Sequence, residues 1–343
     1  AKDIQKDSVG LNLREVEQAV IATFLHSQPI GQSARTRDLT VLIAPNRPDK
    51  IELEKGLHRW AQVSFWLDDQ FTVANENELP GTWRLGNRPN LTQMHAVTAG
   101  RVSDDVVRAR LLDEIGRAKI LSAGANALGV RVHSLPTRPR DIEDDGLFHY
   151  TILGPSGASE SGKPSAEARR YLDETTGPEK PRVYRNAVIL LTPSKDGLEV
   201  ASAGVRDYLA WEMVGADLKE QQKDGNVDVA RMQTLAMNLD KSKGRIPEAI
   251  RQAYCTVVTV SEKNEAQAFK INVTDEPHFT IIKNDPRSRI QDTPVTEEAL
   301  LPDGPYDLWR EGETSRRVKD LSGSFAQLPH LPKMLRAGAI LET

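Results

Sequence analysis

The sequence has a single cysteine, few aromatic residues and almost no excess of charge of either sign. Cys255 alone cannot build a disulfide framework or a multi-cysteine zinc site, and its isolation is typical of a reducing compartment. Aromatic residues make up 5% of the 343 residues, which argues against a stacking platform for sugars or single strands. The formal net charge of -4 excludes binding to nucleic acid by bulk charge alone.

Long hydrophobic runs are also missing. The longest, at 187–191 and 256–260, are about as long as a strand and far shorter than the roughly 20 residues that span a bilayer. The polar start of the chain does not resemble a signal peptide. We therefore expect a cytoplasmic chain without a membrane partner. Because the chain lacks an initial Met and ends on an apolar stretch, we also expect it to be a piece of a longer polypeptide.

Residues 1–95 carry the pattern of a winged-helix unit. Apolar residues at helical spacing are followed by two extended runs around a polar loop, and three helices before a β-hairpin is the order of that fold. The expected elements are helices over 12–28, 36–43 and 49–61 and strands over 63–67 and 83–85.

The rest of the chain predicts two further units, so the expected fold class is multidomain, α/β and α+β. Residues 96–222 alternate strands and helices, which favours a small α/β layer with parallel pairing. Residues 223–343 favour an α+β unit with antiparallel strands that ends in a helical segment over 316–325. Its strands are expected over 255–260, 269–273 and 279–282.

The stretch 157–163, with the sequence GASESGK, matches the spacing of a phosphate-binding loop up to its lysine. Such a loop surrounds phosphate with backbone N–H groups at a helix N-terminus. However, Pro164 stands where Ser or Thr would bind Mg²⁺, and proline has no N–H. Lys163 is thus a candidate cofactor-binding residue, and the alternative is a flexible Gly/Ser loop ahead of a helix that begins with proline.

Two groups of basic residues could contact DNA or a protein partner. The winged-helix region 36–90 has one more acidic than basic residue, and its predicted recognition helix begins with the acidic sequence IELE, so packing against a neighbouring domain is the alternative there. The segment 310–343 has two more basic than acidic residues. The candidate contacts in these two groups are Lys50, Lys55, Arg59, Arg88, Arg316, Arg317 and Lys319.

A third candidate is the sequence RVYRN at 182–186, just before a buried strand. Arg182, Arg185 and Asn186 could meet a phosphate or carboxylate, because arginine makes bidentate contacts with both. The alternative is a structural arginine that pairs with an acidic residue of the preceding loop, namely Asp141, Asp144 or Asp145.

Signatures of catalysis and of metal binding are missing. The seven histidines show no ligand spacing, and no Gly-x-Ser-x-Gly sequence occurs. The sequence therefore predicts no catalytic residue and no metal site in this chain.

Several segments resemble a family of large bacterial AAA-type ATP-binding proteins, the PglY-like ATPases found with DNA methyltransferases in phage-defence islands. The resemblance lies in RVYRNAVILLTP at 182–193 followed by YLAW at 208–211. It extends to GNRPNL at 86–91, PEAIRQAY at 247–254, and the segments 317–321 and 325–335.

The resemblance implies that this chain is the region after the ATPase core, because the P-loop of that family lies N-terminal to such a region. It implies ATP and Mg²⁺ in the parent protein and no cofactor in this chain. The expected function is non-catalytic docking, with the N-terminal ATPase domain of the same polypeptide or duplex DNA as partner. A stand-alone winged-helix DNA-binding regulator is the alternative, and a phosphotransferase that uses 157–163 is the third.

Overall fold

The computed structural model describes residues 33–43, 51, 54, 67–68, 79, 81–84, 89–221, 229–336, 338 and 340. The chain forms two compact units, and each combines two segments: unit 1 has residues 1–104 and 206–243, and unit 2 has residues 105–205 and 244–343. The three consecutive units expected from the sequence differ from this division. The reason is that the long helices α9 (Lys195–Gln221) and α10 (Val229–Ala253) contribute residues to both units.

In unit 1, helix α5 (Leu91–Ala99) packs with residues of α9 and α10. Asn90 starts the helix, because its side-chain oxygen accepts the N–H of Gln93 at 2.9 Å. Arg231 of α10 donates to the carbonyl of Pro89 at 2.6 Å and so holds the chain ahead of α5. The buried apolar residues of this cluster are Leu91, Val214, Leu218 and Leu235.

The described part of residues 1–88 holds α3 (Thr36–Ile43), which confirms the expected second helix. Two short strands, β1 (Ala34–Arg35) and β2 (Thr82–Trp83), pair antiparallel. The N–H of Asp68 donates to the carbonyl of Arg84 at 2.9 Å, which links the two runs expected to form a hairpin. The helix expected over 12–28 and most of the one over 49–61 lie outside the described residues.

Unit 2 is built on one five-stranded sheet with the order β3-β4-β7-β8-β9. The first three strands are parallel, as expected, and the last two continue the sheet antiparallel. The sheet therefore takes strands from both sides of residue 222, where a boundary was expected. The strands are β3 (Arg131–Ser134), β4 (His149–Ile152), β7 (Val188–Thr192), β8 (Thr256–Val260) and β9 (Ala266–Lys270).

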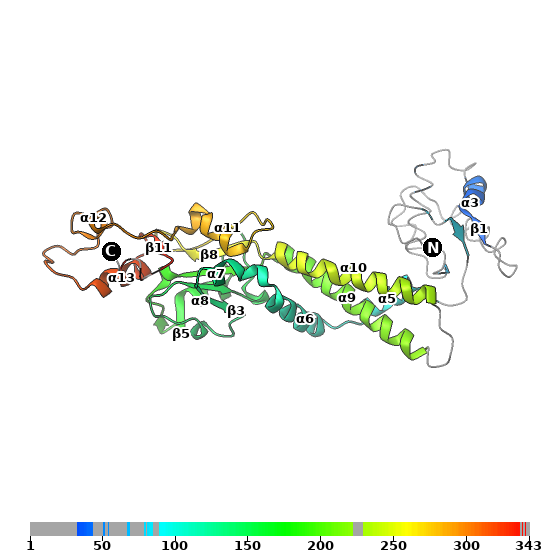
Figure 1. Ribbon diagram of the computed structural model, residues 1–343. Helices are drawn as coiled ribbons and strands as arrows, with labels where there is room; N and C mark the ends of the chain where they lie inside the picture. The colour runs from blue at the N-terminus through cyan, green and yellow to red at the C-terminus, as the bar shows by residue number, and fades with distance from the viewer. Residues whose placement is uncertain are drawn as a thin grey trace. The chain divides into compact units, whose positions relative to one another are not determined.

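Helices cover both faces of this sheet (Figure 1). On one face, α8 (Ala166–Asp173) packs its apolar side chains against Val188, Leu190 and Val258. On the other face, the ring of Tyr150 lies 4.9 Å from that of Phe279 in α11. Because β7 and β8 are buried along their whole length, the sheet is the core of the unit.

One expected strand is wrong, because residues 279–282 belong to the helix α11 (His278–Asn284). Pro277 precedes its first residue, where a missing N–H leaves no helix hydrogen bond unmade. Phe279 and Ile282 are three residues apart, so a helix buries both on one face. The expected strand over 269–273 is found as β9, three residues earlier.

A smaller apolar cluster closes the C-terminal part of unit 2 around Phe325 and Leu331. It includes α13 (Val318–Gln327), which confirms the expected terminal helix. The other short elements of the unit are α6 (Asp104–Arg117), η2 (Lys119–Leu121), α7 (Ala123–Ala127), η3 (Pro139–Asp141), η4 (Pro155–Gly157), β5 (Glu174–Gly177), β6 (Lys180–Pro181), η5 (Arg185–Ala187), η7 (Pro286–Ser288), β10 (Ile290–Gln291), α12 (Glu297–Leu300) and β11 (Lys333–Met334). Among the described helices, none is both long and apolar enough to cross a bilayer.

Candidate functional site

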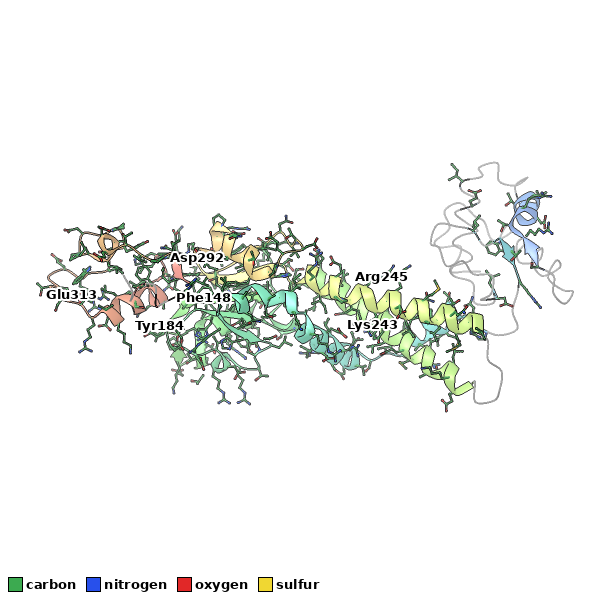
Figure 2. The ribbon with its side chains drawn as sticks, in the orientation of Figure 1. Phe148, Tyr184, Lys243, Arg245, Asp292 and Glu313 are labelled. Atoms are coloured by element: carbon green, nitrogen blue, oxygen red, sulfur yellow. The ribbon has the colours of Figure 1, made fainter. Side chains whose placement is uncertain are left out.

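The two edges of the sheet in unit 2 differ in chemistry. The strands β3, β4 and β7 are parallel, so their amino ends lie at the same edge of the sheet. The antiparallel β8 has its carboxyl end there, and we call this edge the amino edge. Figure 2 labels Phe148 and Tyr184, which directly precede β4 and η5 and so mark it. The order of the strands in this sheet never reverses along the chain. The switch-point crevice that binds ligands in many α/β sheets therefore does not form at the opposite edge.

Three polar side chains form a cluster at the amino edge, which we call the basic cluster: the buried Asn186 and Lys333 and the partly buried Arg289. The Nζ of Lys333 donates to Asn186 Oδ1 at 2.5 Å and to the Val260 carbonyl at 3.2 Å. Arg289 donates through Nη2 to the same two oxygens, at 3.3 and 3.0 Å. All three side chains therefore connect the ends of β7 and β8 to the C-terminal part of the unit.

The same cluster reaches α13 and the loop behind it through main-chain carbonyls. The Nδ2 of Asn186 donates to the carbonyls of Phe325 at 2.8 Å and Leu331 at 3.1 Å. Arg289 Nη1 donates to the Pro329 carbonyl at 2.6 Å. Two of the segments that carry the family resemblance, 182–193 and 325–335, thus meet in one buried cluster.

Arg182 confirms the structural alternative rather than a contact with a ligand. Its side chain is 0% exposed, and Asp144, one of the three acidic residues expected as partner, lies 4.0 Å away. Burial lowers the pKa of the guanidinium, and the carboxylate of Asp144 opposes that shift. Its two Nη atoms donate to four carbonyls, those of Pro139, Ile142, Glu143 and Glu174.

The other two candidates in RVYRN, Arg185 and Asn186, also make hydrogen bonds within the protein. Asn186 is 0% exposed, and Arg182 is buried as well. The expected contact of these two residues with DNA or a partner is therefore wrong. Arg185 donates to Asp173 Oδ1 at 2.5 Å and to Asn264 Oδ1 at 2.7 Å. Arg185 therefore fixes the turn between β8 and β9, where Asn264 has a positive φ of 62°.

The stretch 157–163 does not form a phosphate cradle, because six of its seven backbone N–H groups donate within the protein. The N–H of Ser159 donates to Pro193 O, and that of Gly162 donates to Ala268 O at 2.8 Å. Glu160 and Lys163 exchange backbone hydrogen bonds across a tight turn. Ser165 caps α8 by accepting the Ala168 N–H at 3.1 Å. The geometry favours the alternative, a loop ahead of a capped helix.

We therefore expect Lys163→Ala to leave nucleotide binding of this chain unchanged. The lysine is exposed and the neighbouring amides are not available to phosphate, so ATP should show no saturable binding to either protein. Isothermal titration with Mg-ATP measures this, and Lys180→Ala, at another exposed lysine of the unit, is the control. Saturable binding that only Lys163→Ala removes would contradict the geometry.

The candidate contacts outside RVYRN fall into two groups. Lys50, Lys55, Arg59 and Arg88 lie outside the described residues. Near α13, Arg317 and Lys319 are exposed, whereas Arg316 is partly buried and donates to Ser324 Oγ at 3.1 Å. Only two of the three C-terminal candidates are therefore free to meet a partner's phosphate or carboxylate.

A chain of hydrogen bonds on β3 and β4 was not expected from the sequence. Asp145 Oδ1 accepts the Nε2–H of His149 at 3.0 Å, so the Nδ1 of a neutral His149 must accept the Nε2–H of His133 at 2.9 Å. Burial, followed by the neighbouring His149, lowers the pKa of His133. Burial alone would raise the pKa of Asp145, but hydrogen bonds from the Leu147 N–H and from His149 outweigh it and the pKa is lowered.

The alternation of side chains along strands could have indicated this histidine chain. Arg131 and His133 are two residues apart and face the same side of β3, and the pairing register sets His149 opposite Arg131. Arg131 completes the chain by donating to Asp145 at 2.6 Å. Lys333 could have been noticed because it interrupts the otherwise apolar segment 331–335.

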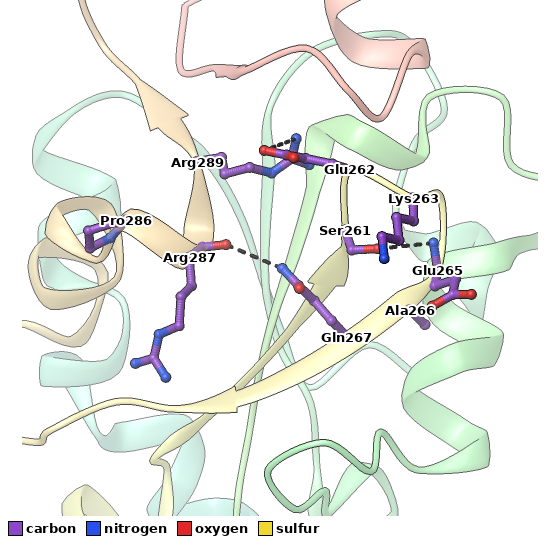
Figure 3. A pocket seen from close by; sticks show the side chains of 9 residues that line it. All are labelled: Ser261, Glu262, Lys263, Glu265, Ala266, Gln267, Pro286, Arg287 and Arg289. Atoms are coloured by element: carbon purple, nitrogen blue, oxygen red, sulfur yellow. Dashed lines mark hydrogen bonds and ion pairs between the residues drawn. The ribbon is translucent and has the colours of Figure 1, made fainter.

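A hollow of about 550 Å³ lies beside the basic cluster, between the β8–β9 turn and η7 (Figure 3). Its lining has both signs of charge, and the Glu262 carboxylate lies 4.0 Å from Arg289. This mixture does not select a ligand of one charge. In the part of the chain that the structure describes, no group of three or more His, Cys, Asp or Glu residues could hold a metal ion.

Comparisons of the chain with protein-family models, with curated proteins and with solved structures found no significant match.

Proposed function

We propose that this chain is a non-catalytic region of a larger AAA-type ATP-binding protein of bacterial phage defence, in which it docks protein partners or DNA. The observation that carries the proposal is the basic cluster, where two segments of the family resemblance meet. The side-chain donors there end on main-chain carbonyls and on Asn186, so these residues build a scaffold. The N-terminal ATPase domain of the same polypeptide is the first partner we propose.

The first segment of unit 1 supports a winged-helix module in this role. The strand β1 lies directly ahead of α3 and pairs with β2, the last strand of the expected hairpin. Such pairing would hold the hairpin against the helices and present its loop as a wing. The same observation favours the second candidate function, a winged-helix regulator that binds duplex DNA by itself.

The salt dependence of binding to duplex DNA tests the two functions against each other. We expect the chain to bind duplex DNA weakly or not at all, with no steep fall in affinity between low and moderate salt, because its net charge is -4. Fluorescence anisotropy with a labelled duplex measures this. High affinity with a steep salt slope would exclude docking to protein partners alone, and would leave DNA as the partner of either the docking region or the stand-alone regulator.

Two charge-reversed variants locate any binding that is found. One replaces Lys50, Lys55, Arg59 and Arg88 with Glu, and the other replaces the exposed Arg317 and Lys319. Loss of binding in the first variant alone assigns DNA to the winged-helix unit. Loss in the second alone assigns it to α13, which has the more basic surroundings.

A further inference from the structure

The surroundings of Lys333 contain too few acceptors for an ammonium group. The residue is 0% exposed, and its Nζ has two acceptors, Asn186 Oδ1 and the Val260 carbonyl. A charged lysine has three N–H donors, whereas an uncharged amine has two. Among the described residues, no carboxylate forms an ion pair with Lys333. The site therefore fits the uncharged form.

The charged groups that face Lys333 are positive. Arg289 approaches from the segment after η7 and shares both of its acceptors, and Arg185 approaches from η5. On the α13 side, the groups at the cluster are the neutral carbonyls of Phe325 and Leu331. Burial and then these two guanidiniums hold the pKa of Lys333 well below its ordinary value.

The acidic residues around the basic cluster pair with other groups. Asp173 pairs with Arg185, and Asp292 pairs with Lys283 at 2.7 Å. Glu262 is 70% exposed and lies 4.0 Å from Arg289, a distance at which solvent screens the pair. No counter-charge in the described part of the chain is therefore placed to hold a proton on Lys333.

We propose that Lys333 is an uncharged amine in the folded protein and that its protonation detaches the C-terminal segment, residues 318–335, from the amino edge of the sheet. A third proton would leave a desolvated cation without an acceptor beside two guanidiniums, and moving Lys333 into water relieves that cost. Because β11 pairs with β10 through Lys333 and Met334, withdrawal of Lys333 separates these strands. Withdrawal of Lys333 also moves the carbonyls of Phe325 and Leu331 away from the Nδ2 group of Asn186, which donates to both. The inference goes beyond the docking function, since it concerns how this segment is held.

The direction of the pH dependence follows from the lowered pKa. The detached segment exposes a lysine with its ordinary pKa of about 10.4, so between the two pKa values it binds one more proton than the attached segment. Attachment therefore strengthens as pH rises through that window and weakens as pH falls. One proton corresponds to at most a tenfold change in the attachment equilibrium per pH unit.

Hydrogen exchange of the α13 amides tests the proposal in the full chain, with each variant compared to wild type at the same pH. We expect wild-type protection to fall relative to Lys333→Met as pH is lowered, by up to tenfold per unit. Methionine removes the titrating group. It should fit the site, because Arg289 still donates to Asn186 Oδ1 and the Val260 carbonyl, the two acceptors of Lys333. Lys319→Met, an exposed lysine of the same segment, is the matched control and should follow wild type.

Two further measurements keep the proposal open to refutation if Lys333→Met does not fold. In wild-type protein with ¹³C-labelled lysine, one Cε resonance should have the position of an uncharged amine at pH 8. Asn186→Asp loses the Nδ2 donations to Phe325 and Leu331, so attachment should be weaker throughout, but the new carboxylate should keep Lys333 charged and flatten the pH dependence. The proposal is overturned if no uncharged resonance occurs at pH 8, or if Lys333→Met and wild type depend on pH in parallel.

Discussion

Replacing Arg182 with methionine is expected to lower the free energy of unfolding of unit 2 by about 3–5 kcal/mol, because four hydrogen bonds to carbonyls are lost at about 1 kcal/mol each. Arg182 is 0% exposed, and its donors satisfy carbonyls from η3, from the loop behind it and from β5. Methionine fills part of the volume but donates nothing, so the buried carbonyls of Pro139 and Ile142 and the partly buried ones of Glu143 and Glu174 lose their donor. Hydrogen exchange of the β7 and β8 amides, which report the opening of the sheet, measures the loss.

Arg182→Lys and Arg170→Met are the controls for this prediction. An ammonium cannot reach acceptors in the fork geometry of a guanidinium, so Arg182→Lys should recover less than half of the loss. Arg170 lies on the exposed side of α8 with 45% of its side chain exposed, and its replacement should change stability by less than about 0.5 kcal/mol. A change below about 1 kcal/mol in Arg182→Met would show that the four carbonyls find water or other donors.

How far the sequence predicts the fold depends on the element. The buried runs at β7 and β8 and the helices α8 and α13 follow from apolar spacing and flanking residues. The four-residue run at 279–282 has no such signal, because a short apolar run fits a strand or a buried helix equally well. Here the tertiary packing determines the structure, since Phe279 packs against Tyr150 of the sheet and Ile282 is buried on the same side of the helix.

The joining of the sheet across residue 222 could not be predicted from local pattern. The pairing of Leu190 with Val258 connects residues that are separated by two long helices, and periodicity carries no information about such a partner. The polar composition near 219–226 is typical of a boundary between units. It separates α9 from α10 instead, and both helices contribute residues to the same two units.

The candidate site shows the same limit. RVYRN predicts a phosphate contact because arginine binds phosphate well, but the same fork geometry serves main-chain carbonyls inside a protein. The sequence left both roles of Arg182 open, and burial decides for the structural one. For Lys333 the sequence indicates only a position in the basic C-terminal segment. Lysine is almost never fully buried without a partner, so a lysine in a sequence is expected at the surface.

Gly197→Ala is the second change with a large expected effect, a loss of about 2–3 kcal/mol from the stability of unit 2. The first turn of α9 crosses the end of α10 so closely that an added Cβ would lie 2.6 Å from the Cα of Ala253 and 2.8 Å from Ser194 Oγ. Backbone cannot move aside as a flexible side chain does. The shift would pass to Tyr254, which donates its hydroxyl to Leu153 O, just after β4, at 2.8 Å. It would also pass to β8, which begins two residues after Tyr254.

Gly204→Ala makes the same chemical change two turns later in α9, where nothing lies within 4 Å of the added Cβ. Alanine restricts the unfolded chain more than glycine does, so this variant should gain about 0.5–1 kcal/mol. The two variants therefore isolate the contact with Ala253 from the helix preference that they share. Exchange of the β8 amides should accelerate in Gly197→Ala and slow in Gly204→Ala. If both variants slow exchange, α9 and α10 do not approach each other as closely as the structure shows, and the hold that this contact gives to the start of β8 is absent.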